Sequence, residues 1–324
     1  MGLTMMATAV AALLGASSCS AAARTTVHYR TVTVDGLQIF YREAGKPGAP
    51  TLILLHGRET SSREFERIIP LLGGKYHVIA PDLPGFGESS APAPAQFAYT
   101  FDHLTQVTRD LLVVLGISRY GLLMHDWGVS VGFRLAAADP AKVTILAVQN
   151  GVICKDPSKP KVWLDPFWER RDAAAEARLR NSYEVTTRIK YHKLGAVDPE
   201  AIPPEAWIVD QYHLDQPGRK DIQVELMYAF GHEDARYAEW RSYLRAHRPP
   251  LLILWGKDSP VYSPDDADCY KHADPAAQVH MFSGGHFLLD ERSPEAARLV
   301  LALDPVRRQR AVPLIYRRPP PIGQ

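Results

Sequence analysis

The residue best suited to chemistry in this 324-residue chain is an aspartate between a buried strand and a helix. Asp126 follows the apolar run 121–124 and precedes Gly128, after which helical spacing begins. A tight strand–turn–helix of this kind holds one side chain at the carboxyl edge of a parallel sheet, where ligands bind. A carboxylate is ionised at neutral pH, so Asp126 is suited to attack a saturated carbon and form an ester. The simpler interpretation is that Asp126 only caps the helix.

A late histidine could complete this chemistry. His286 lies in a glycine-rich loop after the apolar run 277–282. With an aspartate nucleophile, the histidine would take a proton from water, and that water would attack the ester carbonyl. We expect Trp127 to donate its backbone N–H to the ester oxygen, with the helix N-terminus adding positive potential.

The composition limits the classes of partner. Lys and Arg number 37 and Asp and Glu 36, which gives a net charge of +1, and 46% of the residues are hydrophobic. These proportions are those of a globular protein, and a balanced charge provides no field that attracts nucleic acid or an anionic membrane. We expect no nucleic acid partner and no transmembrane span. A monomer or a homodimer fits equally well.

Short apolar runs must position the two residues. An expected hairpin over 27–41 is followed by runs too short for helices, at 51–55, 76–80, 121–124, 143–148, 251–255 and 277–282. They predict buried strands of a mostly parallel, doubly wound sheet. Helical spacing between them predicts helices over 62–72, 101–115, 129–138 and 294–303. The alternation breaks at 153–248, where aromatic residues, Arg and Glu indicate an inserted helical cap.

Five motifs in order resemble the α/β-hydrolase superfamily, in the branch with an aspartate nucleophile that includes epoxide hydrolases and haloalkane dehalogenases. They are His56-Gly57, APDLPGFGES at 80–89, HDWG at 125–128, WGKD at 255–258 and GGHF at 284–287. The resemblance covers about residues 27 to 303 and implies an α/β-hydrolase fold with an eight-stranded sheet. The expected organisation is a core over 25–152 and 249–304, with the cap at 153–248 between its two parts. Its function is then hydrolysis through a covalent ester on Asp126.

The acid that orients the histidine departs from the family pattern. Ser259 occupies the position where the resemblance implies a carboxylate, and Asp258 precedes it. A one-residue shift of the loop would let Asp258 support His286, and we expect Asp258 in this role. The other family position, after the sixth strand, holds Asn150, which carries no charge. A dyad without a carboxylate is the alternative, and it would slow hydrolysis of the ester.

The leaving group separates two reactions. The resemblance implies a backbone N–H from Arg58 in the oxyanion hole. The Arg58 side chain could pair with a carboxylate, bind an anion or simply lie at the surface. Epoxide opening needs acidic donors, and cap tyrosines, of which Tyr191 and Tyr212 are the candidates, would supply them. A halide would use Trp127. The tyrosines favour an epoxide hydrolase-like reaction on a small apolar electrophile, with a haloalkane dehalogenase as the alternative. A weakened or non-catalytic fold that binds a small ligand is the third interpretation.

The remaining features concern location and cofactors. Residues 1–24 begin with 23 uncharged positions, which suit a secretory signal but lack a basic start. A disordered leader or a misplaced start codon is the alternative, so export and a cytoplasmic location both remain open. Residues 305–324 form a Pro- and Arg-rich tail. The cysteines, at 19, 154 and 269, indicate neither a disulfide framework nor a metal site. The Gly85-Phe86-Gly87 sequence is not a dinucleotide loop, so we expect no cofactor and no metal.

Overall fold

A computed structural model describes residues 25–154 and 164–303 of the chain. The predicted leader, the Pro- and Arg-rich tail and residues 155–163 of the expected cap lie outside these ranges. Within the described ranges, no helix is long and apolar enough to cross a membrane.

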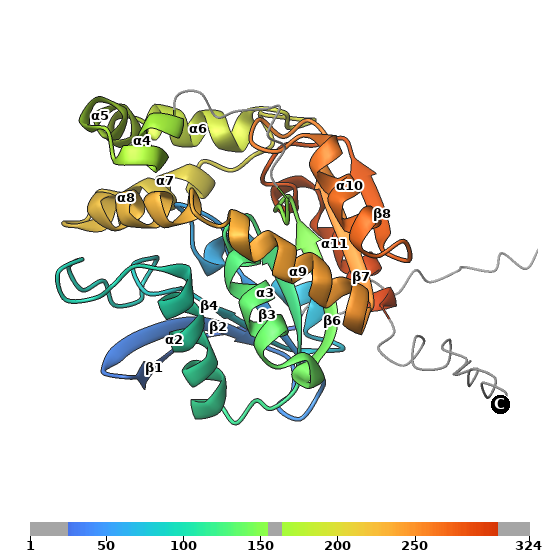
Figure 1. Ribbon diagram of the computed structural model, residues 1–324. Helices are drawn as coiled ribbons and strands as arrows, with labels where there is room; N and C mark the ends of the chain where they lie inside the picture. Colours follow the sequence, from blue (N-terminus) through green and yellow to red (C-terminus); the bar gives the residue numbers. More distant parts are fainter. Residues whose placement is uncertain (1–24, 155–163, 304–324) are drawn as a thin grey trace, which may run out of the picture.

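The centre of the fold is one sheet of eight strands in the order β1-β2-β4-β3-β5-β6-β7-β8 (Figure 1). β1 and β2 form an antiparallel hairpin and β2 is antiparallel to β4, whereas the other neighbours are parallel. This arrangement confirms the predicted mostly parallel sheet. The strands are β1 (Val27–Val34), β2 (Leu37–Ala44), β3 (Thr51–Leu55), β4 (His77–Pro81), β5 (Tyr120–His125), β6 (Val143–Gln149), β7 (Leu251–Gly256) and β8 (Gln278–Phe282).

Alternate side chains of the central strands build two apolar cores, one on each face of the sheet. Ile53 and Leu55 of β3 contribute to one core, and Leu52 and Leu54 to the other. Because successive side chains of a strand point to opposite faces, a nearly continuous apolar run is required here. The first core includes residues of α2 (Phe101–Val114), α3 (Gly128–Ala138) and α10 (Pro264–Ala273). The second includes residues of η1 (Ser62–Phe65), α1 (Ile69–Leu72) and α11 (Leu289–Ala302). A short turn, η2 (Pro140–Lys142), precedes β6.

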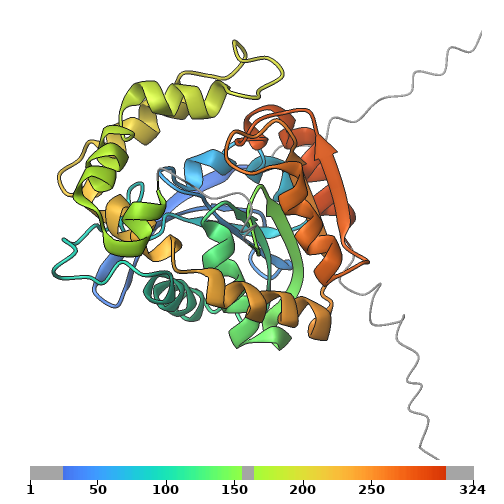
Figure 2. The same ribbon diagram turned by 45° about the horizontal axis from the view of Figure 1, so that its top comes forward.

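Six helices lie between β6 and β7, and we call them the helical insertion. They are α4 (Asp165–Arg170), α5 (Ala173–Asn181), α6 (Val185–Lys193), α7 (Glu205–Leu214), α8 (Arg219–Phe230) and α9 (Asp234–His247). In Figures 1 and 2, α4 to α8 arch over the carboxyl ends of the strands, and α9 returns beside α3. The insertion therefore covers the edge of the sheet where Asp126 was expected.

Two predicted helices differ from the structure. The expected helix over 62–72 is two short elements, η1 and α1, because Pro70 in the first turn of α1 has no N–H to continue a preceding helix. The last helix begins at Leu289 rather than at Pro294. Pro294 therefore lies inside this helix, and a kink at Arg292 accommodates it.

The expectation of no disulfide is wrong for two of the three cysteines. Cys154, after β6, is bonded to Cys269 of α10. The two residues are 115 positions apart in the sequence, and spacing alone does not reveal such a pair. The bond connects the start of the helical insertion to the second part of the core.

Candidate active site

Asp126 lies at a sharp turn between β5 and α3. Its φ of 47° is in the left-handed region, which Asp tolerates better than most residues, and its side chain is buried. Gly128 permits the turn, since a Cβ there would meet the carbonyl oxygen of Leu55 at 2.1 Å. The predicted strand–turn–helix is therefore present, with the carboxylate held at the carboxyl edge of the sheet.

Three residues, Arg58, His286 and Tyr262, contact the Asp126 carboxylate. The backbone N–H of Arg58 donates to Oδ1 at 3.0 Å, and Nε2 of His286 lies 3.5 Å from Oδ2. Burial raises the pKa of Asp126, but His286, His125 and Arg58 outweigh burial and hold that pKa well below its usual value. The carboxylate is therefore ionised at neutral pH, as a nucleophile requires.

His286 is buried and is neutral at pH 7. Burial lowers the pKa of His286 to about 4, and the neighbouring His125 contributes in the same direction, although Asp126 opposes them. Burial lowers the pKa of His125, but Glu64, 3.0 Å from its Nδ1, outweighs burial and raises that pKa above its usual value. A neutral imidazole is the form that can accept a proton.

The residue that faces the other nitrogen of His286 is a serine. Oγ of Ser259 lies 3.3 Å from Nδ1 of His286. Asp258 does not occupy this place, because its carboxylate contacts Nζ of Lys257 and accepts the backbone N–H of Gly284. Asn150 exchanges two hydrogen bonds with the backbone of Gly256 and so fixes the end of β7.

The Arg58 side chain contributes a cation beside the nucleophile. Its guanidinium pairs with Glu59 at 3.1 Å and lies over the rings of Tyr191 and Trp127. Arg188, buried on α6, also pairs with Glu59 and lies over Tyr191. Glu59 therefore neutralises one of the two positive charges.

Tyr191 is held between these arginines. The Arg58 cation lowers the pKa of Tyr191 below its usual value against the effect of burial, and Arg188 adds to the shift. A lowered pKa makes the phenol a stronger proton donor. Tyr212, the second candidate, is 62% exposed and stacks edge-on with His213, so the structure does not bring it into the site.

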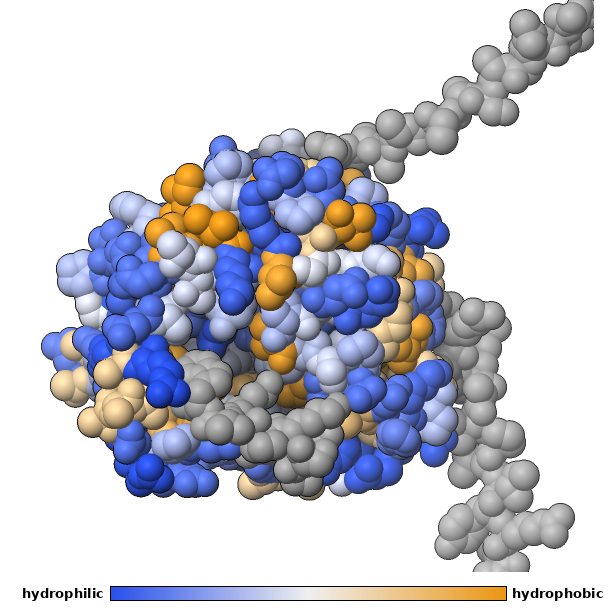
Figure 3. All heavy atoms as spheres, turned by 90° about the horizontal axis from the view of Figure 1, so that it is seen from above, coloured by the Kyte–Doolittle hydropathy of each residue, from blue (hydrophilic) through white to orange (hydrophobic). Residues whose placement is uncertain are grey.

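A cavity of about 150 Å³ joins these groups beneath the helical insertion. Asp126, His286, Trp127, Arg58 and Tyr191 all line it. Seen from above, the surface over the insertion is hollowed near its centre (Figure 3). A second cavity of about 280 Å³ shares Trp168, Phe230, Pro260, Val261 and Tyr262 with the first. The site therefore has room for an apolar group beside the reacting centre.

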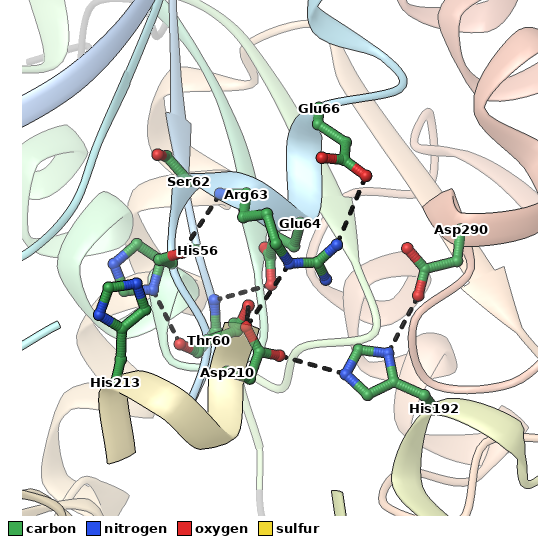
Figure 4. A network of polar contacts seen from close by, with 12 residues as sticks. His56, Thr60, Ser62, Arg63, Glu64, Glu66, His192, Asp210, His213 and Asp290 are labelled. Atoms are coloured by element: carbon green, nitrogen blue, oxygen red, sulfur yellow. Dashed lines mark hydrogen bonds and ion pairs between the residues drawn. The ribbon is translucent and has the colours of Figure 1, made fainter. Parts of the chain in front are cut away.

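A buried polar network connects the insertion to the core behind this cavity (Figure 4). His192 of α6 lies 3.2 Å from Asp210 of α7 and 3.0 Å from Asp290 of α11. Arg63 of η1 also faces Asp210, at 3.6 Å. The ring of His192 stacks on Phe287, which follows the candidate base in the sequence, with ring centroids 4.0 Å apart. The network thus holds the roof of the cavity against the loop of His286.

Tyr262 and Arg188 line the cavity and were missed by sequence analysis. Tyr262 contacts Asp126, which together with burial raises the pKa of that tyrosine far above its usual value. No motif indicates Tyr262. Arg188 had a weak signal, because it lies three positions before Tyr191 and so on the same face of a helix. Glu59 adjoins Arg58 in a motif, but its positive φ of 58° and complete side-chain burial are not visible in the sequence.

Known proteins resemble this chain over most of its length. The family model of the α/β hydrolase fold matches residues 50–196. An uncharacterized hydrolase of Saccharomyces cerevisiae is 32% identical over 275 residues, which are 83% of this chain and 94% of the relative. The chain belongs to the α/β-hydrolase superfamily.

Other relatives of this α/β-hydrolase include haloalkane dehalogenases, and a solved epoxide hydrolase shares its fold. A haloalkane dehalogenase of Psychrobacter cryohalolentis is 34% identical over 279 residues, 82% of this chain and 86% of the relative. The structure of an epoxide hydrolase, CorEH, superimposes with a TM-score of 0.71 over 86% of this chain and 98% of that chain. At 21% identity, the latter similarity shows the fold alone. The haloalkane dehalogenase relative agrees with the resemblance read from the five motifs.

Within the described residues, no group of three His, Cys, Asp or Glu side chains is arranged to hold a metal ion.

Proposed function

We propose that this α/β-hydrolase opens small, largely apolar epoxides through an ester on Asp126. The observation that carries the proposal is the shared cavity, in which an ionised aspartate and a tyrosine of lowered pKa face the same space. Attack on a strained ring needs a nucleophile on one side and a proton donor on the other.

The first step forms the ester. An oxygen of Asp126 attacks a ring carbon, the carbon–oxygen bond of the epoxide breaks, and the released alkoxide takes the proton of Tyr191. Arg58 and Arg188 stabilise the resulting phenolate, because both cations lie against that ring. Bulk solvent then returns the proton to Tyr191.

The second step hydrolyses the ester. Water attacks the ester carbonyl of Asp126 while His286 takes a proton from that water. The backbone N–H of Arg58 already donates to Oδ1 of Asp126, so it is placed to stabilise the oxyanion. In the proposal, Trp127 supplies the second backbone N–H. The acyl–oxygen bond then breaks while the bond from that oxygen to the substrate carbon remains intact. The leaving alkoxide takes the proton from His286, which releases a diol, and the new carboxyl group of Asp126 loses its proton to solvent.

Haloalkane dehalogenation is a second candidate. Trp127 and Arg58 both line the cavity next to Asp126, and an indole N–H with a guanidinium would stabilise a departing halide. The haloalkane dehalogenase named among the relatives also favours this reaction.

The mass of the covalent adduct separates these candidates. The variant His286→Gln should accumulate an adduct when incubated with an aryl epoxide or a haloalkane. An epoxide adds its whole mass, whereas a haloalkane adds its alkyl group and loses the halide. Asp126→Ala is the matched control and should give no adduct. If neither electrophile labels His286→Gln and the wild type forms no product, the fold binds ligands without catalysis and the proposal is wrong.

A further inference from the structure

The hydroxyl group of Ser259 contacts three groups. Its Oγ accepts the backbone N–H groups of Val261 at 3.2 Å and Tyr262 at 3.3 Å, and it lies 3.3 Å from Nδ1 of His286. A serine hydroxyl has two lone pairs and one proton. The two backbone groups can only donate, so together they occupy both lone pairs of Oγ.

The hydroxyl of Ser259 therefore has its proton to donate to Nδ1 of His286. If Nδ1 of His286 carried a hydrogen, three donors would compete for two lone pairs, and the serine proton would lack an acceptor among these contacts. If Nδ1 is bare, each of the three contacts pairs a donor with an acceptor. Proton positions follow from such networks rather than from heavy atoms, and this network has one consistent assignment.

The opposite side of the ring agrees with this assignment. Nε2 of His286 lies 3.5 Å from Oδ2 of Asp126, an ionised carboxylate that can only accept. A hydrogen on Nε2 satisfies that contact, whereas a lone pair on Nε2 would face another lone pair.

We infer that Ser259 holds His286 in the Nε2–H tautomer, which makes hydrolysis of the ester the slow step of turnover. The inference rests on the proposed function. The water that attacks the ester must give its proton to Nε2, since Nε2 is the ring nitrogen beside Asp126 and Nδ1 faces Ser259. With a hydrogen already on Nε2, the ring must first exchange tautomers and lose its bond to Ser259. The protein then forms the ester and retains it.

Ser259 is thus a positioning residue whose effect is opposite to that of the acid in related sites. A carboxylate at position 259 would accept from Nδ1–H and leave the lone pair of Nε2 directed at water. It could also accept the backbone N–H groups of Val261 and Tyr262, so Ser259→Asp keeps the loop contacts. Ser259→Asp leaves the chemistry of ester formation and ester hydrolysis the same. Only the rate of ester hydrolysis changes.

Two readouts test the inference. The first is the ¹⁵N spectrum of the imidazole in labelled wild type, Ser259→Ala and Ser259→Asp, with His286→Gln used to assign the signals. We expect hydrogen on Nε2 in the wild type, on Nδ1 in Ser259→Asp, and no strict preference in Ser259→Ala. The second is rapid quench with intact mass, using whichever electrophile labels Asp126. We expect an adduct on most wild-type molecules in the steady state, and hydrolysis of the ester about 10²- to 10⁴-fold faster in Ser259→Asp.

The outcomes separate the inference from the proposed function. Hydrogen on Nδ1 in the wild type overturns the inference whatever the activity. An adduct that forms on Asp126 but does not accumulate in the wild type, with no gain in Ser259→Asp, overturns the inference and leaves the proposed function intact. No adduct and no product in any variant overturns both. A thermal unfolding curve of each variant shows that it is folded.

Discussion

Nε2 of His286 lies 3.5 Å from Oδ2 of Asp126, so the loops after β5 and β8 meet at one edge of the sheet. Parallel strands make this possible, because their carboxyl ends share that edge. Arg58, Trp127 and Tyr191 line the same cavity as this pair.

Replacement of Tyr191 should separate epoxide opening from dehalogenation. Tyr191→Phe removes the proton donor and should slow formation of the ester from an epoxide about 10²-fold or more, with little effect on halide release. Stopped-flow or quench measurements of adduct formation would give both rates. Tyr212→Phe is a matched change at the other tyrosine favoured by the sequence. Because Tyr212 is exposed, the same rates should not change. If Tyr212→Phe were the damaging variant, the assignment of the donor would be wrong.

The variant Asp258→Asn tests which residue supports His286. The motif predicts Asp258, whereas the structure has Ser259 beside the ring. Asp258 contacts Lys257 and the backbone N–H of Gly284. Lys257 is the main cause that lowers the pKa of the Asp258 carboxyl. We expect a change of less than about threefold in the rate of ester hydrolysis, followed in single-turnover experiments. A loss of about 10³-fold would mean that Asp258 supports His286 after all.

The bridge from His192 to Asp210 and Asp290 should make stability depend on pH. The pKa of His192 is above its ordinary value of 6.5, because the two carboxylates outweigh burial. A group with a raised pKa stabilises the folded state fully below its unfolded pKa and loses that effect as the pH rises through the folded pKa. Denaturant titrations between pH 5.5 and 9 should show His192→Gln destabilised by about 3–5 kcal/mol at low pH, with the gap narrowing as the pH rises.

The neighbouring pair of Lys193 and Glu200 provides the control for His192. It joins the same helix to a glutamate whose side chain is 86% exposed, so Lys193→Gln should cost less than about 1 kcal/mol. A gap between His192→Gln and the wild type that is constant with pH would contradict a charged His192.

The disulfide should contribute measurably to stability. Its closed loop spans 115 positions, and loss of such a bond typically costs about 2–5 kcal/mol. The double variant Cys154→Ser, Cys269→Ser should unfold at lower denaturant and no longer respond to reductant. Cys19→Ser should respond to reductant as the wild type does. Equal stability of the wild type with and without reductant would argue against a disulfide between Cys154 and Cys269. Because disulfides persist in oxidising compartments, a confirmed bond would favour export of the chain.

The parts of the fold that sequence could predict are those set by short-range patterns. Buried strands such as Leu251–Gly256 appear as unbroken apolar runs, and the turn at Asp126 is visible because a strand, a polar residue and, two positions later, a glycine precede a helix. The Asp126–His286 juxtaposition followed from the order of motifs. These features depend on residues that are neighbours in the sequence or on a shared sheet edge.

The features that sequence could not predict depend on contacts between distant segments. Tyr191 and Tyr212 both lie on inserted helices, and only the packing of α6 and α7 decides that one faces the cavity and the other faces solvent. The loop after β7 is similar, since a one-residue shift exchanges Asp258 and Ser259, and the structure places Ser259 beside His286. The disulfide likewise joins segments that the sequence keeps apart.

The central claim, a covalent ester on Asp126, can be tested most directly with isotopic oxygen. A single turnover in H₂¹⁸O, with enzyme in excess over an aryl epoxide or a haloalkane, should place ¹⁸O in the carboxylate of Asp126, because water attacks the acyl carbon. The peptide that contains Asp126 should then gain 2 Da, while the first-turnover product carries ¹⁶O. If ¹⁸O appears in the product and the peptide remains unlabelled, water attacks the substrate directly and the proposed mechanism is wrong.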